Sequence, residues 1–98
     1  MKEDRYKITK EEQEEAEKKF FPRGVDGPLI KFPKKEKLKL ATLSVIIKRV
    51  ELEKTYSEKE INAILKDLYA DFVTLRRYLI EYGFLDRKDD GSAYWVKN

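Results

Sequence analysis

Apolar residues recur at helical spacing in two neighbouring stretches of the second half of the chain. A spacing of three or four residues puts such side chains on one face of an α-helix. In the first stretch these positions are Ile61, Ile64, Leu65 and Leu68. In the second they are Phe72, Leu75, Leu79 and Tyr82. The pattern predicts two amphipathic helices joined by a very short turn.

Capping residues set the ends of these two helices. Ser57 followed by Glu60 matches a capping box, so the first helix starts there and ends near Tyr69. Asp71 is a suitable N-cap for the second helix, and Gly83 is a natural residue just beyond its C-terminus. The second helix is therefore expected over about residues 72–82.

A tight hairpin is predicted directly after this pair of helices. Residues 84–88 and 92–96 have the composition of two short strands. Between them lies Asp89-Asp90-Gly91, and an Asp-Gly pair supports the positive φ angles of a hairpin turn. Tyr94 and Trp95 then point to opposite faces of the last strand. Tyr78, on the helix before it, is expected to be the most exposed of the aromatic residues.

The first half of the chain predicts two more helices and little else. Thr9 followed by Glu12 forms another capping box, which opens a helix over about residues 10–20 with a thin apolar face that must dock elsewhere. Residues 21–28 are dense in turn residues and predict a loop. Residues 29–32 are expected to form a short strand that ends at Pro33. A long helix, apolar around more than half of its circumference and therefore central, is expected from Lys34 to about Val50.

Joined in this order, the elements predict a mainly α fold with a small β component. A three-helix core followed by a hairpin is the arrangement of a winged helix-turn-helix, in which the second helix of the pair enters a DNA groove and the hairpin is the wing. The N-terminal tail and the extra helix together occupy residues 1–20, and the winged-helix-like domain occupies residues 21–98.

Composition excludes several kinds of chemistry. The 98 residues suit one small domain, and they include no cysteine and no histidine. Disulfides, thiol nucleophiles, zinc fingers and histidine acid–base catalysis are therefore excluded. Glycine-rich phosphate loops and catalytic carboxylate pairs are also lacking, so we expect no enzyme activity and no cofactor. The start of the chain has no apolar signal region and no stretch reaches membrane length, so a cytoplasmic protein is expected.

Positive charge is concentrated in one block. The net charge of the chain is +3, while residues 21–40 alone contain six basic and two acidic residues. This block includes Lys34, Lys35 and Lys37, which are candidate phosphate contacts, although a solvated surface is the common role of such a run. Nucleic acid is thus a permitted partner.

The second helix of the pair supplies the candidate base contacts. A rotation of 100° per residue puts Val73, Arg77 and Ile80 on an exposed flank, with Thr74 beside it. Arg77 suits a guanine edge, Val73 a thymine methyl group and Thr74 a phosphate. Alternatively, Arg77 or the neighbouring Arg76 pairs with a carboxylate and ties this helix to its neighbours; for Arg76 this structural role is preferred.

The predicted wing gives conflicting signals. Arg87 and Lys88 are candidate phosphate contacts, but Asp89 and Asp90 follow them directly and cancel their charge. This acidic tip favours the rival interpretation, in which the domain is a protein–protein interaction or dimerisation module that binds no nucleic acid. Asn62 is also unusual so early in a helix, and a contact with the backbone before the long helix is its expected role.

Several short motifs together resemble one bacterial family. They are Phe32-Pro33 with Lys35 and Lys37; Tyr56-Ser57-Glu58, Glu60-Ile61-Asn62 and Leu65; Asp71, Leu75-Arg76-Arg77 and Leu79; and Gly91-Ser92 with Tyr94-Trp95. Over about residues 20–96 the chain resembles the domain-of-unknown-function family numbered two thousand and eighty-seven. That family occurs as small free-standing proteins and appended to helix-turn-helix transcriptional regulators, and the resemblance carries over no catalytic residues. The family pattern often has a histidine shortly before the residue matching Asp71, where this chain has Tyr69.

The function predicted from the sequence is a DNA-binding or transcription-associated module. Double-stranded DNA is the first candidate partner, and a protein partner or a second copy of the chain is the alternative. The predicted nucleic-acid contacts are Val73, Thr74, Arg77, Ile80, Lys34, Lys35, Lys37, Arg87 and Lys88.

Overall fold

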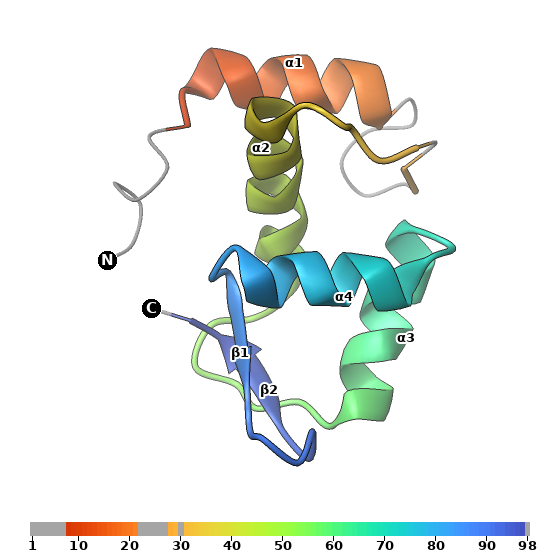
Figure 1. The fold of residues 1–98 in the computed structure, drawn as a ribbon, viewed down its shortest axis with the longest axis vertical. Helices are drawn as coiled ribbons and strands as arrows, with labels where there is room; N and C mark the ends of the chain where they lie inside the picture. The colour runs from red at the N-terminus through yellow and green to blue at the C-terminus, as the bar shows by residue number, and fades with distance from the viewer. Residues whose placement is uncertain (1–7, 22–27, 30, 98) are drawn as a thin grey trace.

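The computed structural model describes residues 8–21, 28–29 and 31–97 of the chain (Figure 1). Within these residues the fold is mainly helical with one small antiparallel hairpin, which confirms the predicted α+β class. The elements in order are α1 (Lys10–Phe20), α2 (Glu36–Ile46), the 3₁₀ turn η2 (Ile47–Arg49), α3 (Glu58–Leu68), α4 (Phe72–Glu81), β1 (Leu85–Arg87) and β2 (Tyr94–Val96).

Capping boxes open α1 and α3, as predicted. The Thr9 hydroxyl accepts a hydrogen bond from the Glu12 amide, and the Glu12 carboxylate accepts one from the Thr9 amide. Ser57 and Glu60 make the same reciprocal pair at the start of α3. Each box satisfies two backbone N–H groups that have no partner inside the helix.

The two ends of α4 are also as predicted. The Asp71 carboxylate accepts a hydrogen bond from the Thr74 amide, which caps the first turn. After the last turn, Gly83 has φ +80°, and the amides of Gly83 and Phe84 donate to the carbonyls of Ile80 and Leu79. This is a Schellman ending, which requires the left-handed conformation that glycine adopts without strain. It turns the chain from α4 directly into β1.

The long central helix is shorter than predicted. It begins at Glu36 instead of Lys34, because Lys35 keeps an extended backbone (φ −70°, ψ 138°) and offers no capping side chain. Pro33, two residues before Lys35, is buried. At its other end the helix stops at Ile46 and tightens into η2, which ends at Arg49. The backbone amide of Val50 donates a hydrogen bond to the carbonyl of Ile47 at 3.0 Å.

A strand was predicted over residues 29–32. This prediction is wrong for the described residues 29, 31 and 32, because none of them lies in a strand. Instead of pairing with a neighbouring strand, the backbone amide of Leu29 donates a hydrogen bond to the carbonyl of Leu68 at 2.7 Å. This bond gives a partner to a carbonyl group at the C-terminal end of α3. Phe32 packs its ring against aromatic residues of other segments. Most of the predicted loop, residues 22–27, lies outside the described residues.

The predicted hairpin is present, with shorter strands. Leu85 is paired with Val96 and Arg87 with Tyr94, and Gly91 in the turn has φ +77°. Tyr56 forms an isolated bridge with Tyr94 through two hydrogen bonds of 2.8 Å. The hairpin is therefore anchored to the segment that precedes α3.

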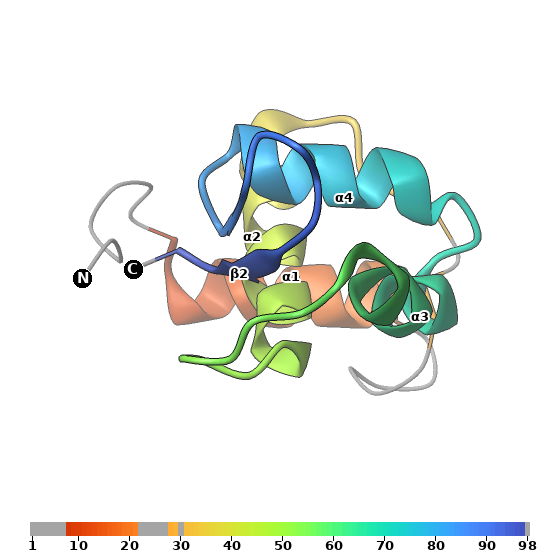
Figure 2. The same cartoon turned by 90° about the horizontal axis from the view of Figure 1, so that it is seen from below.

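The helices surround a core that all of them share. Leu43 of α2, Ile61 and Leu65 of α3, and Leu75 and Leu79 of α4 are all fully buried. In Figure 1, α4 crosses the lower end of α2, α3 lies on the lower right, and the hairpin descends from the left end of α4; Figure 2 shows the same elements from below.

The N-terminal helix α1 docks within the same chain. It lies across the top of α2 in Figure 1 and buries Ala16 completely. The side-chain amide of Gln13 also donates a hydrogen bond to the Ser44 hydroxyl of α2 at 2.9 Å. The thin apolar face of α1 is thus covered by the domain itself.

Candidate nucleic-acid interface

The outer face of α4 carries one exposed arginine beside one exposed aliphatic residue. The Arg77 side chain is 62% exposed and Val73 is 51% exposed. On the opposite side of the helix Leu75 and Leu79 are fully buried. This contrast is what the helical periodicity predicted, because the buried residues fix which side of α4 faces solvent.

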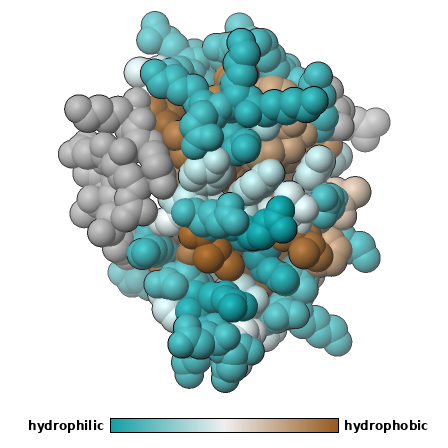
Figure 3. Space-filling view, viewed as in Figure 1, coloured by the Kyte–Doolittle hydropathy of each residue, from teal (hydrophilic) through white to brown (hydrophobic). Residues whose placement is uncertain are grey.

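A shallow hollow of about 300 Å³ separates α4 from the hairpin. Its lining brings together four of the predicted contact residues, Val73, Arg77, Ile80 and Arg87. Figure 3 shows this side of the molecule, where hydrophobic surface is interrupted by hydrophilic groups. Ile80 is only half-buried although it packs against the core. The arrangement combines cations with apolar surface over a helix and an adjoining hairpin, and one carboxylate, Glu81, also lines the hollow.

On the other flank of α4, Lys34 and Thr74 line a second hollow of about 250 Å³ together with Lys39. Lys34 is exposed, whereas Thr74 and Lys39 are half-buried. Lys39 belongs to the basic block of residues 21–40, but it was not among the predicted nucleic-acid contacts, because nothing in its spacing shows that it lies beside α4. Cations therefore flank the exposed face of α4 on both sides.

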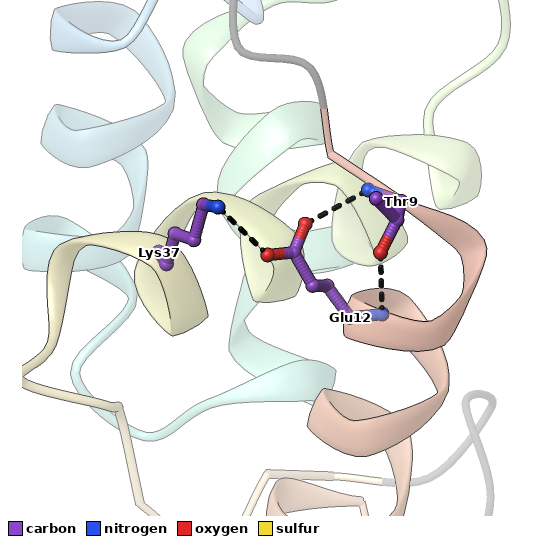
Figure 4. Close-up of polar contacts among 3 residues, drawn as sticks. All are labelled: Thr9, Glu12 and Lys37. Carbon is purple, nitrogen blue, oxygen red and sulfur yellow. Dashed lines mark hydrogen bonds and ion pairs between the residues drawn. The ribbon is translucent and has the colours of Figure 1, made fainter.

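The other two predicted lysines are not gathered at α4. Lys37 points to α1, where its ammonium group lies 3.1 Å from the Glu12 carboxylate (Figure 4). Hydrogen bonding to the Thr9 backbone, followed by the hydrogen bond and charge of Lys37, lowers the pKa of Glu12. The carboxylate therefore stays ionised and offsets the charge of Lys37 at neutral pH. Lys35 is exposed at the N-cap of α2.

The tip of the hairpin carries both signs of charge on exposed side chains. Arg87 and Lys88 line a third shallow hollow together with Asp89 and Asp90. Hydrogen bonds from the side chain and backbone of Ser92 lower the pKa of Asp90. This carboxylate is therefore ionised at neutral pH, and the tip remains a mixed-charge surface.

Arg77 has only weak partners among the residues that the structure describes. Its Nε atom lies 3.9 Å from the Glu81 carboxylate, with both side chains more than half exposed. Its guanidinium carbon lies 5.8 Å from the centroid of the Tyr78 ring. An exposed pair one helical turn apart contributes little stability, so the guanidinium remains accessible to another partner.

Arg76 has the structural role that was preferred for it, but with a different partner. Its guanidinium group donates a hydrogen bond to the side-chain oxygen of Asn62 on α3, so the partner is an amide and not a carboxylate. The same contact corrects the role expected for Asn62, which bonds to α4 and not to the backbone before α2. Sequence spacing could not show this, because the contact depends on how α3 and α4 cross.

Tyr78 is not the exposed aromatic residue that was expected. It is half-buried, because its ring stacks on Phe32 with centroids 5.1 Å apart and planes 22° apart. The Lys39 ammonium group lies 4.8 Å from the centroid of the same ring. Tyr94 is fully buried and Trp95 is half-buried, in agreement with their opposite orientations on β2.

The described part of the chain lacks a membrane-spanning helix and a cluster of metal ligands. Among residues 8–21, 28–29 and 31–97, no helix is long and apolar enough to cross a membrane. The same residues contain no group of three carboxylate, histidine or cysteine side chains placed to bind a metal ion.

The chain belongs to a bacterial protein family, described as "Uncharacterized protein conserved in bacteria (DUF2087)", whose profile matches residues 28–96. The match confirms the family resemblance drawn from the sequence motifs. It covers α2 to β2, and α1 lies outside it. Neither the curated proteins nor the solved structures contain a significant match to this chain.

Proposed function

We propose that this protein is a cytoplasmic, DNA-binding or transcription-associated module of the winged-helix type. In this proposal α4 is the recognition helix and the β1–β2 hairpin is the wing. The order of elements supports this assignment, since α2, α3 and α4 share one core and the hairpin follows α4 directly.

The observation that carries the proposal is the exposed face of α4. Arg77 lies on this face next to Val73, and both share a hollow with Arg87 of the hairpin. A helix that enters a major groove needs exposed side chains for base edges and cations beside it for phosphates. Here the same short stretch of surface supplies both.

Each residue has a role that follows from its chemistry. Arg77 donates two hydrogen bonds to a guanine edge, while Val73 and Ile80 make apolar contacts such as that with a thymine methyl group. Thr74, Lys34, Arg87 and Lys88 contact phosphates and fix the register of the domain on the duplex. Lys35 adds to the positive potential at the start of α2. Lys37 is not assigned a phosphate contact, because Glu12 already offsets its charge.

Fluorescence anisotropy of a labelled mixed-sequence duplex, titrated with protein at low and then rising salt, tests the proposal. Four phosphate contacts predict that log K falls with log salt with a slope of about −3 to −4. Lys88→Ala should reduce this slope by about 1 unit. Lys59→Ala, which removes an exposed cation from the first turn of α3, is the matched control and should leave the slope unchanged. Absence of binding at low salt would remove DNA from the list of partners.

The second candidate function is protein–protein interaction or dimerisation without nucleic acid. Leu52 is 62% exposed and lines a hollow of about 510 Å³ with the apolar residues Ile47, Val50 and Val96. This surface and the carboxylates at the hairpin tip both favour a protein partner. Sedimentation velocity of wild type and Leu52→Ser tests it: a concentration-dependent dimer that the substitution weakens would support this function.

A further inference from the structure

The hollow on the flank of α4 that faces away from the hairpin has an aromatic lining. Phe32, Tyr69 and Tyr78 contribute their rings, and we call this space the aromatic hollow. The Phe32 centroid lies 5.1 Å from that of Tyr78 and 6.1 Å from that of Tyr69. The three rings come from different segments: the one before α2, the C-cap of α3 and the middle of α4. A wall assembled from three segments is held in place by the fold itself.

The same hollow has a positive charge. Lys34 and Lys39 line it, and no carboxylate is among the described residues that form its lining. The Lys39 ammonium group lies over the face of the Tyr78 ring, 4.8 Å from its centroid. Because this lysine is half-buried and has no carboxylate beside it in the hollow, an incoming anion gains a charge-assisted contact. The half-buried Thr74 adds a hydroxyl group to the lining.

Size restricts what the hollow can accept. Its volume is about 250 Å³. An apolar protein cavity of roughly 150 Å³ is enough to hold benzene. One ring with a small charged group therefore fits, whereas a larger ligand would extend into solvent.

We propose that the aromatic hollow binds a small planar aromatic carboxylate. The ring of the ligand lies against the aromatic wall, and its carboxylate pairs with Lys39 and Lys34 and accepts a hydrogen bond from Thr74. This binding goes beyond the proposed action on DNA and does not depend on it. Because α4 supplies Thr74 and Tyr78 to the lining, the ligand sits directly beside the outer face of that helix.

The test is a titration of ¹⁵N-labelled full-length protein, without DNA, followed through its amide chemical shifts. Benzoate is the probe, cyclohexanecarboxylate is matched to it in charge but has no aromatic face, and inorganic phosphate supplies charge alone. We expect saturable shifts at residues 32, 69, 74 and 78 with benzoate, with a Kd on the order of 1 mM. Cyclohexanecarboxylate and phosphate should bind about three- to tenfold more weakly, as the loss of aromatic contacts predicts.

Two substitutions complete the test. Lys39→Gln should weaken benzoate binding about five- to tenfold, because it removes the half-buried cation. Lys59→Gln, an exposed position in the first turn of α3, should leave binding unchanged. No saturable shifts with benzoate, equal affinity for benzoate and phosphate, or equal affinity of wild type and Lys39→Gln would each overturn the proposal. Since no DNA is present, these outcomes are separate from success or failure of DNA binding.

Discussion

The guanidinium group of Arg76 on α4 donates a hydrogen bond to the side-chain oxygen of Asn62 on α3. The same group lies 5.6 Å from the centroid of the Tyr94 ring on β2. One side chain therefore contacts α3 and the hairpin from α4. This contact fixes how the three elements are oriented, and it leaves the neighbouring Arg77 as the arginine that faces solvent.

Asn62→Ala is expected to destabilise the fold by about 1–2 kcal/mol. The substitution removes a charge-assisted hydrogen bond and leaves a partly buried guanidinium group without its partner. Urea denaturation measures the free energy of unfolding. The matched control is Arg77→Ala, which loses an exposed ion pair and a distant contact with the Tyr78 ring and should change this free energy by no more than about 0.5 kcal/mol. Equal losses in the two variants would contradict the structural role of Arg76.

Glu81→Gln is expected to strengthen DNA binding about two- to fivefold at low salt. The Glu81 carboxylate lies 3.9 Å from Arg77, where it repels phosphate and competes for the guanidinium group. Anisotropy titration of the variant and wild type on the same duplex measures the effect. Glu53→Gln, which removes an exposed carboxylate from the turn before α3, serves as the control. Weaker binding by Glu81→Gln would contradict the placement of DNA over this face of α4.

Gly91→Ala is expected to cost about 1 kcal/mol, because Gly91 has φ +77° and an L-residue is strained there. A steric clash is not the cause, since an added Cβ atom would lie 3.4 Å from the nearest atom, Oε1 of Glu58. Gly91→Asn should cost less, because asparagine adopts this conformation more readily than alanine. Thermal unfolding of the two variants gives the comparison. If asparagine costs as much as alanine, backbone strain is not the cause.

Acid is expected to destabilise the domain partly through its two capping boxes. Backbone hydrogen bonding, from Thr9 to Glu12 and from Ser57 to Glu60, lowers the pKa of each carboxyl below its ordinary value of 4.5. The folded state then binds fewer protons than the unfolded state. The stabilisation is therefore complete above pH 4.5 and is lost as the pH falls through the lowered pKa values.

A double variant, Glu12→Gln with Glu60→Gln, isolates this contribution. Glutamine keeps the oxygen that accepts the hydrogen bond but has no proton to gain. The melting temperature of the variant should fall less between pH 7 and pH 3 than that of wild type. An identical fall in the two proteins would assign acid sensitivity to other carboxylates.

Features set by neighbours in sequence could be predicted, and those set by remote contacts could not. Thr9, Ser57, Asp71 and Gly83 mark helix ends through bonds that span only a few residues, so the chain order alone revealed them. The outer face of α4 followed from periodicity for the same reason. The start of α2 was missed because Lys35 carries no capping signal that would have marked it.

The candidate sites depended on long-range packing. Arg76 contacts Asn62 across two helices, and Tyr78 is covered by Phe32, which is far from it in sequence. Lys39 lies beside α4 only because α2 packs there. None of these contacts leaves a periodic signal in the sequence. The three aromatic residues of the hollow lie far apart in the sequence, at positions 32, 69 and 78, so no sequence pattern connects them.

The central claim, that α4 and the hairpin beside it bind duplex DNA, is tested most directly by amide chemical shifts of the labelled protein on addition of a short duplex at low salt. The account predicts that the largest shifts lie at residues 73–81 and 87–91, and that Arg77→Ala suppresses them while Lys59→Ala does not. Absence of shifts at low salt, or shifts confined to the surface around Leu52 and Val96, would contradict it.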